Sequence, residues 1–176
     1  MDFFILNRDN RIQSPMKLNA IPNFFESGME QQLEKDDLSA SAFLLNESKA
    51  VELTDFIFFD ISDTAKHRGY QKYMVISNKL QPIFSKYNPP IAFKPFAFIN
   101  SKEKQQHMYW LCKVETVIKA DKIEDATLYS QLIPYYNSRI IRLELQNESK
   151  FIITLEVLES ILKYGALGVT FRKIEA

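Results

Sequence analysis

Two apolar runs, rich in aromatic residues, dominate the pattern of hydrophobic and polar positions along the chain. Residues 91–100 are mostly apolar, residues 101–106 are polar or charged, and residues 107–118 are again largely apolar. Two such runs joined by a short polar tip predict a long β-hairpin. The hairpin carries Trp110 and Cys112, each the sole residue of its type. We expect this hairpin to lie at the centre of a sheet.

Shorter apolar runs predict further strands. Phe3–Leu6 is bounded by polar residues and predicts an edge or first strand. We also expect strands at Tyr73–Ile76 and over the second half of residues 51–61, where β-branched and aromatic residues gather. The second half of residues 139–145 alternates between apolar and polar positions, and this segment should pair with the apolar run at 151–153. The total is seven to nine strands.

Two strand–helix–strand units follow one another at a distance along the chain. In the first, Ser77 is a candidate N-cap, and Pro82, five residues later, implies a helix that is short, kinked or begins nearer Gln81. In the second, Thr154 is the candidate cap, and Gly165 marks the helix end. The apolar positions at helical spacing are Leu80, Ile83, Phe84 and Tyr87 in the first unit, and Leu155, Leu158, Ile161 and Leu162 in the second. The units are either an internal repeat or two uses of a common motif.

These elements predict an α+β fold, with two or three helices packed on one side of a mixed, mostly antiparallel sheet. With 176 residues, a single domain over 1–176 is expected. We expect residues 70–176 to form its core, and residues 1–70 an N-terminal part that the sequence pattern defines less clearly.

Composition and charge narrow the function classes. Lys and Arg number 22, as do Asp and Glu, so the formal net charge is zero and the basic excess typical of a nucleic-acid-binding protein is missing. No run approaches 18 apolar residues, so we expect no membrane partner. The N-terminus does not resemble a signal peptide, and the lone Cys112 gives no intramolecular disulfide. We therefore expect a cytoplasmic protein.

Candidate catalytic chemistry is confined to one cluster. Asp60, Asp63 and His67 follow a predicted strand and offer oxygen and nitrogen groups for a metal or an acid–base pair. A polar loop can contain such a set by chance. The chain has no glycine-rich phosphate loop, nucleophile elbow or paired-cysteine metal motif, so we predict no cofactor, metal or catalytic residue.

Candidate partner-binding residues fall in three places. An acidic stretch between residues 26 and 37 carries a net charge of minus four and would suit a basic partner. The hairpin tip offers two lysines. Because side chains alternate along a strand, we expect one of the adjacent Tyr109 and Trp110 to enter the core and the other to lie against a helix or at a contact surface. The candidate residues are Glu26, Glu30, Glu34, Asp36, Asp37, Lys102, Lys104 and Trp110.

The order of several segments resembles a known family. The segments are the N-terminal Met-Asp-Phe-Phe-Ile-Leu, Val75–Leu80 opening a helix, Ile91–Phe96, Tyr109–Leu111 with a following Asp121, Ile140–Leu143, a capped helix and Gly168–Phe171. Together they resemble the immunity proteins of bacterial polymorphic toxin systems, over residues 70–176 and the first few residues. The resemblance implies a small cytoplasmic protein that binds and neutralises a cognate protein toxin without catalysis or cofactor. It implies no particular contact residues.

Two alternatives remain. The first is an enzyme of unrecognised type that uses Asp60, Asp63 and His67, which would have to converge in one pocket. The second is a structural module that forms a homo-oligomer through an exposed strand edge.

Overall fold

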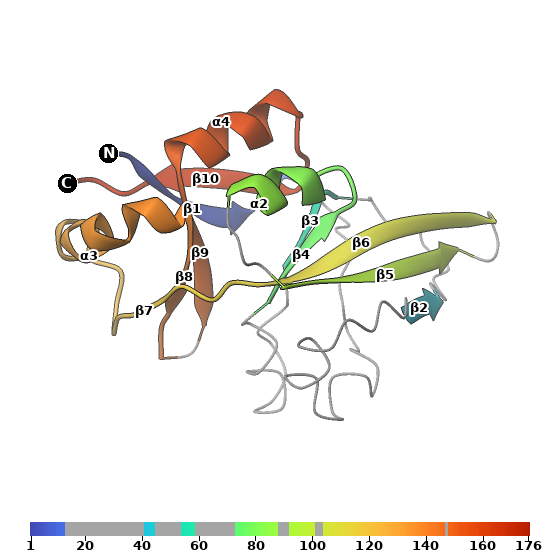
Figure 1. Cartoon of the computed structure of the whole chain (residues 1–176), viewed down its shortest axis with the longest axis horizontal. Helices are drawn as coiled ribbons and strands as arrows, with labels where there is room; N and C mark the ends of the chain where they lie inside the picture. The colour runs from blue at the N-terminus through green and yellow to red at the C-terminus, as the bar shows by residue number, and fades with distance from the viewer. Residues whose placement is uncertain (13–40, 45–53, 59–72, 88–91, 101–103, 147) are drawn as a thin grey trace.

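The structure is a computed structural model that describes residues 1–12, 41–44, 54–58, 73–87, 92–100, 104–146 and 148–176 (Figure 1). Ten strands in these residues form two sheets of five strands each. Three α-helices and a 3-10 helix accompany them. The α+β class and the mostly antiparallel pairing are confirmed. The strands form two sheets where one was expected, and their number, ten, exceeds the predicted range of seven to nine.

The first sheet, here called the terminal sheet, contains strands from both ends of the chain. Its order is β10-β1-β9-β8-β7, and only β7 and β8 are parallel. Its strands are β1 (Phe3–Arg8), β7 (Val117–Lys119), β8 (Ile140–Glu144), β9 (Ser149–Thr154) and β10 (Val169–Lys173).

The second sheet, here called the hairpin sheet, is built around the predicted hairpin. Its order is β2-β5-β6-β4-β3, and only β2 and β5 are parallel. Its strands are β2 (Ser41–Leu44), β3 (Phe56–Ile57), β4 (Tyr73–Ser77), β5 (Ala92–Asn100) and β6 (Gln105–Lys113). The hairpin runs in register from Ala92 opposite Lys113 to Asn100 opposite Gln105. Both of its strands are interior, as predicted.

The second limb of the hairpin is shorter than predicted. β6 ends at Lys113, and the chain then crosses to the terminal sheet, where Val117–Lys119 forms β7. The carbonyl oxygen of Thr116 accepts a 2.9 Å hydrogen bond from the Arg142 amide at this crossing. One apolar run in the sequence therefore supplies strands to both sheets.

The prediction of β1 as a first strand is correct, but its edge position is wrong. β1 lies between β10 and β9, and antiparallel ladders pair it on both sides. Phe3 and Ile5 face one apolar cluster, while Leu6 faces another. A strand covered on both faces needs a continuous apolar run, which explains Phe-Phe-Ile-Leu.

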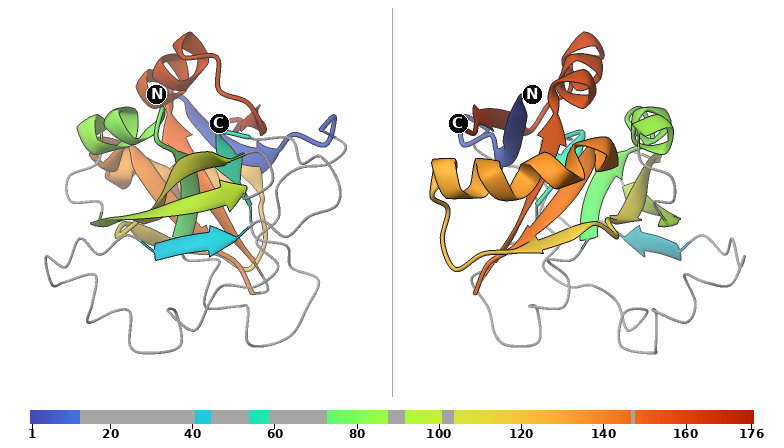
Figure 2. Two further views of the ribbon diagram at one scale, coloured as in Figure 1. Left: turned by 90° about the vertical axis from the view of Figure 1, so that its right-hand side faces the viewer. Right: turned by 60° about the vertical axis from the view of Figure 1, so that its left-hand side comes forward.

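Two apolar cores lie on opposite faces of the terminal sheet. The larger one, here called the shared core, includes Ile153 of the terminal sheet, Ile76 of the hairpin sheet, and residues of α2 (Gln81–Tyr87) and α4 (Leu155–Lys163). The smaller one includes Leu128 and Leu132 of α3 (Asp125–Leu132), with the 3-10 helix η3 (Ile133–Ser138) following directly. The prediction that all helices lie on one side of the sheet is wrong. The helices cover both faces of the terminal sheet (Figures 1 and 2).

The two strand–helix–strand units have the same local topology. β4 and β5 flank β6, while β9 and β10 flank β1, and every pairing in both sets is antiparallel. α2 and α4 connect the flanking strands and lie side by side, joined by a 2.8 Å hydrogen bond between the Tyr87 and Ser160 hydroxyls (Figure 1). This likeness supports the predicted correspondence of the units.

Candidate functional site

Most of the predicted site residues lie outside the part of the chain that the structure describes. These are the acidic candidates Glu26, Glu30, Glu34, Asp36 and Asp37, the tip residue Lys102, and the cluster Asp60, Asp63 and His67. Their roles stay predictions.

The predicted site residues that the structure does describe lie on the hairpin. Lys104 is exposed at the tip, with φ of 54°. Trp110 is half-buried against the shared core, meets Phe93 edge-on, and donates a 2.9 Å hydrogen bond to Asn78 Oδ1. Tyr109, on the opposite face of β6, is buried. Of the two aromatic residues, Trp110 is therefore the more accessible.

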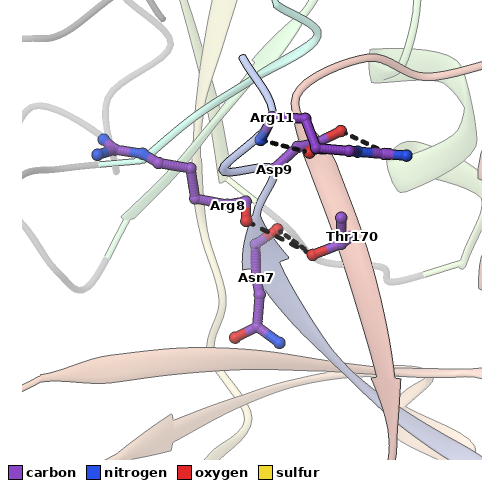
Figure 3. A network of polar contacts seen from close by, with 5 residues as sticks. All are labelled: Asn7, Arg8, Asp9, Arg11 and Thr170. Carbon is purple, nitrogen blue, oxygen red and sulfur yellow. Dashed lines mark hydrogen bonds and ion pairs between the residues drawn. The ribbon is translucent and has the colours of Figure 1, made fainter. Parts of the chain in front are cut away.

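A functional candidate that the sequence did not indicate lies where the sheets meet, around the short strand β3. Directly after β3, the Phe58 carbonyl accepts a 3.0 Å hydrogen bond from Arg8 Nη2. Figure 3 shows the adjoining contacts, where the Thr170 hydroxyl lies 3.5 Å from the carbonyl oxygens of Asn7 and Arg8.

Asp9 and Arg11 complete that group of contacts (Figure 3). The Arg11 guanidinium donates hydrogen bonds of 2.9 and 2.8 Å to the two carboxylate oxygens. These bonds lower the pKa of Asp9. They fix the backbone directly after β1. The Asp9 amide also donates a 3.3 Å hydrogen bond to the Gly168 carbonyl, which holds this segment close to the start of β10.

Asp55, just before β3, joins β4 to the turn between α4 and β10. Its Oδ1 accepts a 2.7 Å hydrogen bond from the Ser77 hydroxyl, and its Oδ2 accepts a 2.9 Å bond from the Leu167 amide. Its own amide donates to the Leu167 carbonyl at 2.9 Å, and its carbonyl accepts from the Ser77 amide at 2.8 Å. These four bonds form what we call the Asp55 network.

Lys79 adds a charged contact to the network. Its Nζ lies 3.6 Å from Asp55 Oδ2 and donates a 3.3 Å hydrogen bond to the Gly165 carbonyl. The Asp55 side chain is only 13% exposed and that of Lys79 is 44% exposed. The cation therefore offsets a carboxylate that is largely removed from water and whose charge would otherwise be costly to bury.

Thr54 and Tyr109 form the floor beneath the network. The buried Tyr109 hydroxyl donates a 2.8 Å hydrogen bond to the Thr54 carbonyl. Burial, helped by the negative charge of Asp55, raises the pKa of Tyr109. Gly168, with φ of +87°, packs so closely on Thr54 that a Cβ atom would lie 2.5 Å from Thr54 Cβ.

A cavity of about 490 Å³ opens over this network. Its lining combines a carboxylate, an ammonium group, an imidazole and two amides with two large apolar side chains. The lining residues are Thr54, Asp55, Ser77, Asn78, Lys79, Gln106, His107, Met108, Tyr109 and Leu167. Such a mixture of a few fixed polar groups and apolar surface is typical of a binding site.

The turn beside this cavity exposes three large apolar side chains. Leu162, Tyr164 and Leu167 are 57%, 50% and 61% exposed. They lie within six residues at the end of α4 and in the turn that follows, and we call them the turn surface. Exposed apolar residues scattered singly are ordinary, whereas three on one ordered turn make this turn a candidate contact surface.

The turn itself has a well-defined backbone. The Gly165 amide donates to the Leu162 carbonyl at 2.9 Å and the Ala166 amide to the Ile161 carbonyl at 3.4 Å, which is the Schellman motif. Gly165 has φ of 62°, as its predicted role at the helix end requires. The turn surface is thus held from the helix side by this motif and from the sheet side by the Asp55 network.

A second depression, of about 510 Å³, lies between β7, β8 and α3. Charged residues of both signs line it, among them Lys122 and Glu124, which form an ion pair with each other. None of the exposed large apolar residues of the described chain borders it. The cavity over Asp55 is therefore the stronger candidate for a contact with another molecule.

Little in the amino-acid sequence predicts this site. Asp55 lies within residues 51–61, which predict only a strand, and Leu167 follows Gly165, which predicts only the end of a helix. The two are 112 positions apart. Tyr109 lies in a predicted strand, but the prediction of Ser77 as a helix N-cap is wrong: Ser77 ends β4 opposite Tyr109, its hydroxyl donates to Asp55, and α2 begins only at Gln81.

Comparison of the chain with family models, with curated protein sequences and with solved structures gave no match. Among the described residues, no three His, Cys, Asp or Glu side chains form a group that could hold a metal ion. None of the helices in this part of the chain has the length and apolar character needed to cross a membrane.

Proposed function

We propose that this protein is an immunity-type protein of the bacterial cytoplasm, which binds and neutralises a cognate protein toxin by direct contact and without catalysis. The observation that carries the proposal is the turn surface, where three large apolar side chains are exposed on a backbone fixed from both sides. Preordered apolar anchors beside polar groups are typical of the few residues that dominate protein–protein affinity.

The resemblance of residues 70–176 to immunity proteins supports the same proposal. Several matching segments provide interior strands, among them Val75–Ser77 of β4 and Tyr109–Leu111 of β6. A family defined by such packing segments would keep its scaffold while the contact surface changes with the toxin. The acidic stretch of residues 26–37 remains a further candidate contact for a basic toxin surface.

The test is co-expression with the product of the neighbouring toxin gene. Cells that produce this protein should survive the toxin, and a tagged copy should retain an inactive variant of the toxin in a pull-down. Survival without a complex would argue for an indirect mechanism. Toxicity that persists despite full expression would refute the proposal.

A matched pair of variants tests the contact surface. Leu167→Asp places a charge on the turn surface and should abolish both survival and the complex, since a buried unpaired charge at an interface costs several kcal/mol, about 3 or more. Leu155→Asp, on α4 but 37% exposed and outside the turn, is the control and should retain protection. Equal loss in both variants would place the contact elsewhere.

A further inference from the structure

We infer that Asp55 is a positioning residue for partner binding: its network holds the turn between α4 and β10 so that Leu162, Tyr164 and Leu167 stand in their binding arrangement before the partner arrives. The inference rests on the proposed function. It goes beyond it by assigning a role in binding to a residue whose own side chain is too enclosed to be the main contact.

The geometry gives Asp55 control over this turn. Leu167 exposes 61% of its surface, yet both its amide and its carbonyl are bonded to Asp55 at 2.9 Å. The side chain thus presents apolar area while the backbone beneath it is fixed. Lys79 holds the turn backbone two residues earlier, because its Nζ donates a hydrogen bond to the Gly165 carbonyl.

The network also has the chemistry of a firm attachment. A carboxylate that accepts a hydroxyl and a backbone amide forms charge-assisted hydrogen bonds, which are shorter and stronger than neutral ones. The donor–acceptor distances of 2.7 and 2.9 Å fit this class. Ser77 is itself in a ladder with Tyr109 of β6, so the carboxylate is anchored to the interior of the hairpin sheet.

A turn held in this way should affect how fast the partner binds. If Asp55 is removed, the turn samples other conformations, and the apparent affinity falls by the fraction that remains competent. The loss should appear mainly in the association rate, because the contacts made in the complex are unchanged. Removing a contact residue should instead appear mainly in the dissociation rate.

The first experiment uses the free protein and amide hydrogen exchange. Asp55→Ala should speed exchange of the Leu167 amide at least roughly tenfold while the core amides of β9 keep their protection. Asp55→Asn, which retains an acceptor oxygen, should show a smaller increase. Glu175→Gln, near α3 and away from this turn, controls for the loss of one negative charge. Unchanged exchange at Leu167 in Asp55→Ala would overturn the inference whatever the toxin does.

The second experiment measures binding rates with an inactive variant of the toxin encoded beside this gene. Asp55→Ala should associate roughly tenfold more slowly with little change in dissociation, and Leu167→Ala should dissociate faster with little change in association. If the wild-type protein forms no complex, the proposed function fails, and the inference with it. If it binds and Asp55→Ala binds at the same rate, the inference alone fails.

Discussion

At the scale of single residues, Thr154 shows a buried polar group without compensation. Thr154 is fully buried at the junction of β9 and α4, and its amide donates to the Arg139 carbonyl at 3.0 Å. Its hydroxyl has no hydrogen-bond partner within the described structure, and the predicted cap bond to the helix is not formed. Thr154 is therefore the N-cap by position alone.

Replacing this hydroxyl should stabilise the protein. Thr154→Val keeps the shape and removes the unpaired group, so the free energy of unfolding should rise by about 1 kcal/mol. Thr154→Ser keeps the hydroxyl and loses a methyl group, and it should lower the free energy of unfolding by about 1 kcal/mol. Urea unfolding of both variants checks this, and a loss of stability in Thr154→Val would show that the hydroxyl is satisfied in solution.

Two glycines at the ends of the α4–β10 turn differ in what surrounds them. Gly168→Ala would place Cβ against Thr54 at a positive φ and should destabilise by about 3 kcal/mol or more. Gly165→Ala has the same sign of φ but no atom within 4 Å of the new Cβ, so about 1 kcal/mol is expected. Thermal unfolding compares the pair, and equal losses would mean that the close approach to Thr54 relaxes.

At the scale of elements, the C-terminal segment is attached to α3 by charged contacts. Arg172 of β10 donates hydrogen bonds of 3.0 and 2.7 Å to the two oxygens of Asp125, in the first turn of α3. The Glu175 amide reaches the same carboxylate at 3.4 Å, and the buried Ile174 amide donates to the Phe3 carbonyl at 3.0 Å. Helix, edge strand and C-terminus are thus joined at one carboxylate.

This contact predicts a specific acid dependence. The Arg172 hydrogen bond lowers the pKa of Asp125 in the folded protein. The ionised Asp125 therefore contributes to the free energy of unfolding at neutral pH, and this contribution is lost as pH falls from about 4 through the folded pKa. Both side chains are partly exposed, which limits the effect to under about 1 kcal/mol. Asp125→Asn should lose this part of the pH dependence, measured as urea midpoints between pH 6 and pH 2.

The matched background is Arg172→Gln. In that protein Asp125→Asn should have little further effect on the pH profile, because the cause of the lowered pKa is already gone. An undiminished effect in the double variant would assign the acid sensitivity to another carboxylate.

At the scale of the whole molecule, the two sheets share one apolar core. Ile161 of α4, Phe84 of α2, Cys112 of β6 and Ile153 of β9 all belong to it and are fully buried. Burial raises the pKa of the Cys112 thiol, so it behaves as a small apolar side chain. Neither sheet can lose its partner without exposing this core.

The shared core predicts a single cooperative transition. Ile161→Ala should reduce the free energy of unfolding by about 2–5 kcal/mol. The unfolding midpoint measured by Trp110 fluorescence should fall and should equal the midpoint measured by far-UV circular dichroism. This is expected although Trp110 lies in the hairpin sheet and the substitution lies on the helix over the terminal sheet. A Trp110 transition that stays at the wild-type midpoint would show that the sheets unfold separately.

What the sequence determined by itself was local. Apolar runs and turn residues identified the hairpin, both strand–helix–strand units and the stop at Gly165, because these depend on side-chain period and backbone preference within a few residues. The two-sheet division did not follow from that pattern. A run such as residues 107–118 carries no mark of the point where β6 leaves one sheet and β7 enters the other.

Only the tertiary structure decided where the candidate site lies. Asp55 acts through Ser77 at the end of β4 and Leu167 in the turn before β10, and neither strand periodicity nor helix capping encodes such a distant pairing. The interior place of β1 is similar, since a continuous apolar run indicates that both faces of the strand are covered but not that both of its edges are paired. Local sequence thus sets which elements form, and packing between elements distant in the chain decides which polar groups meet.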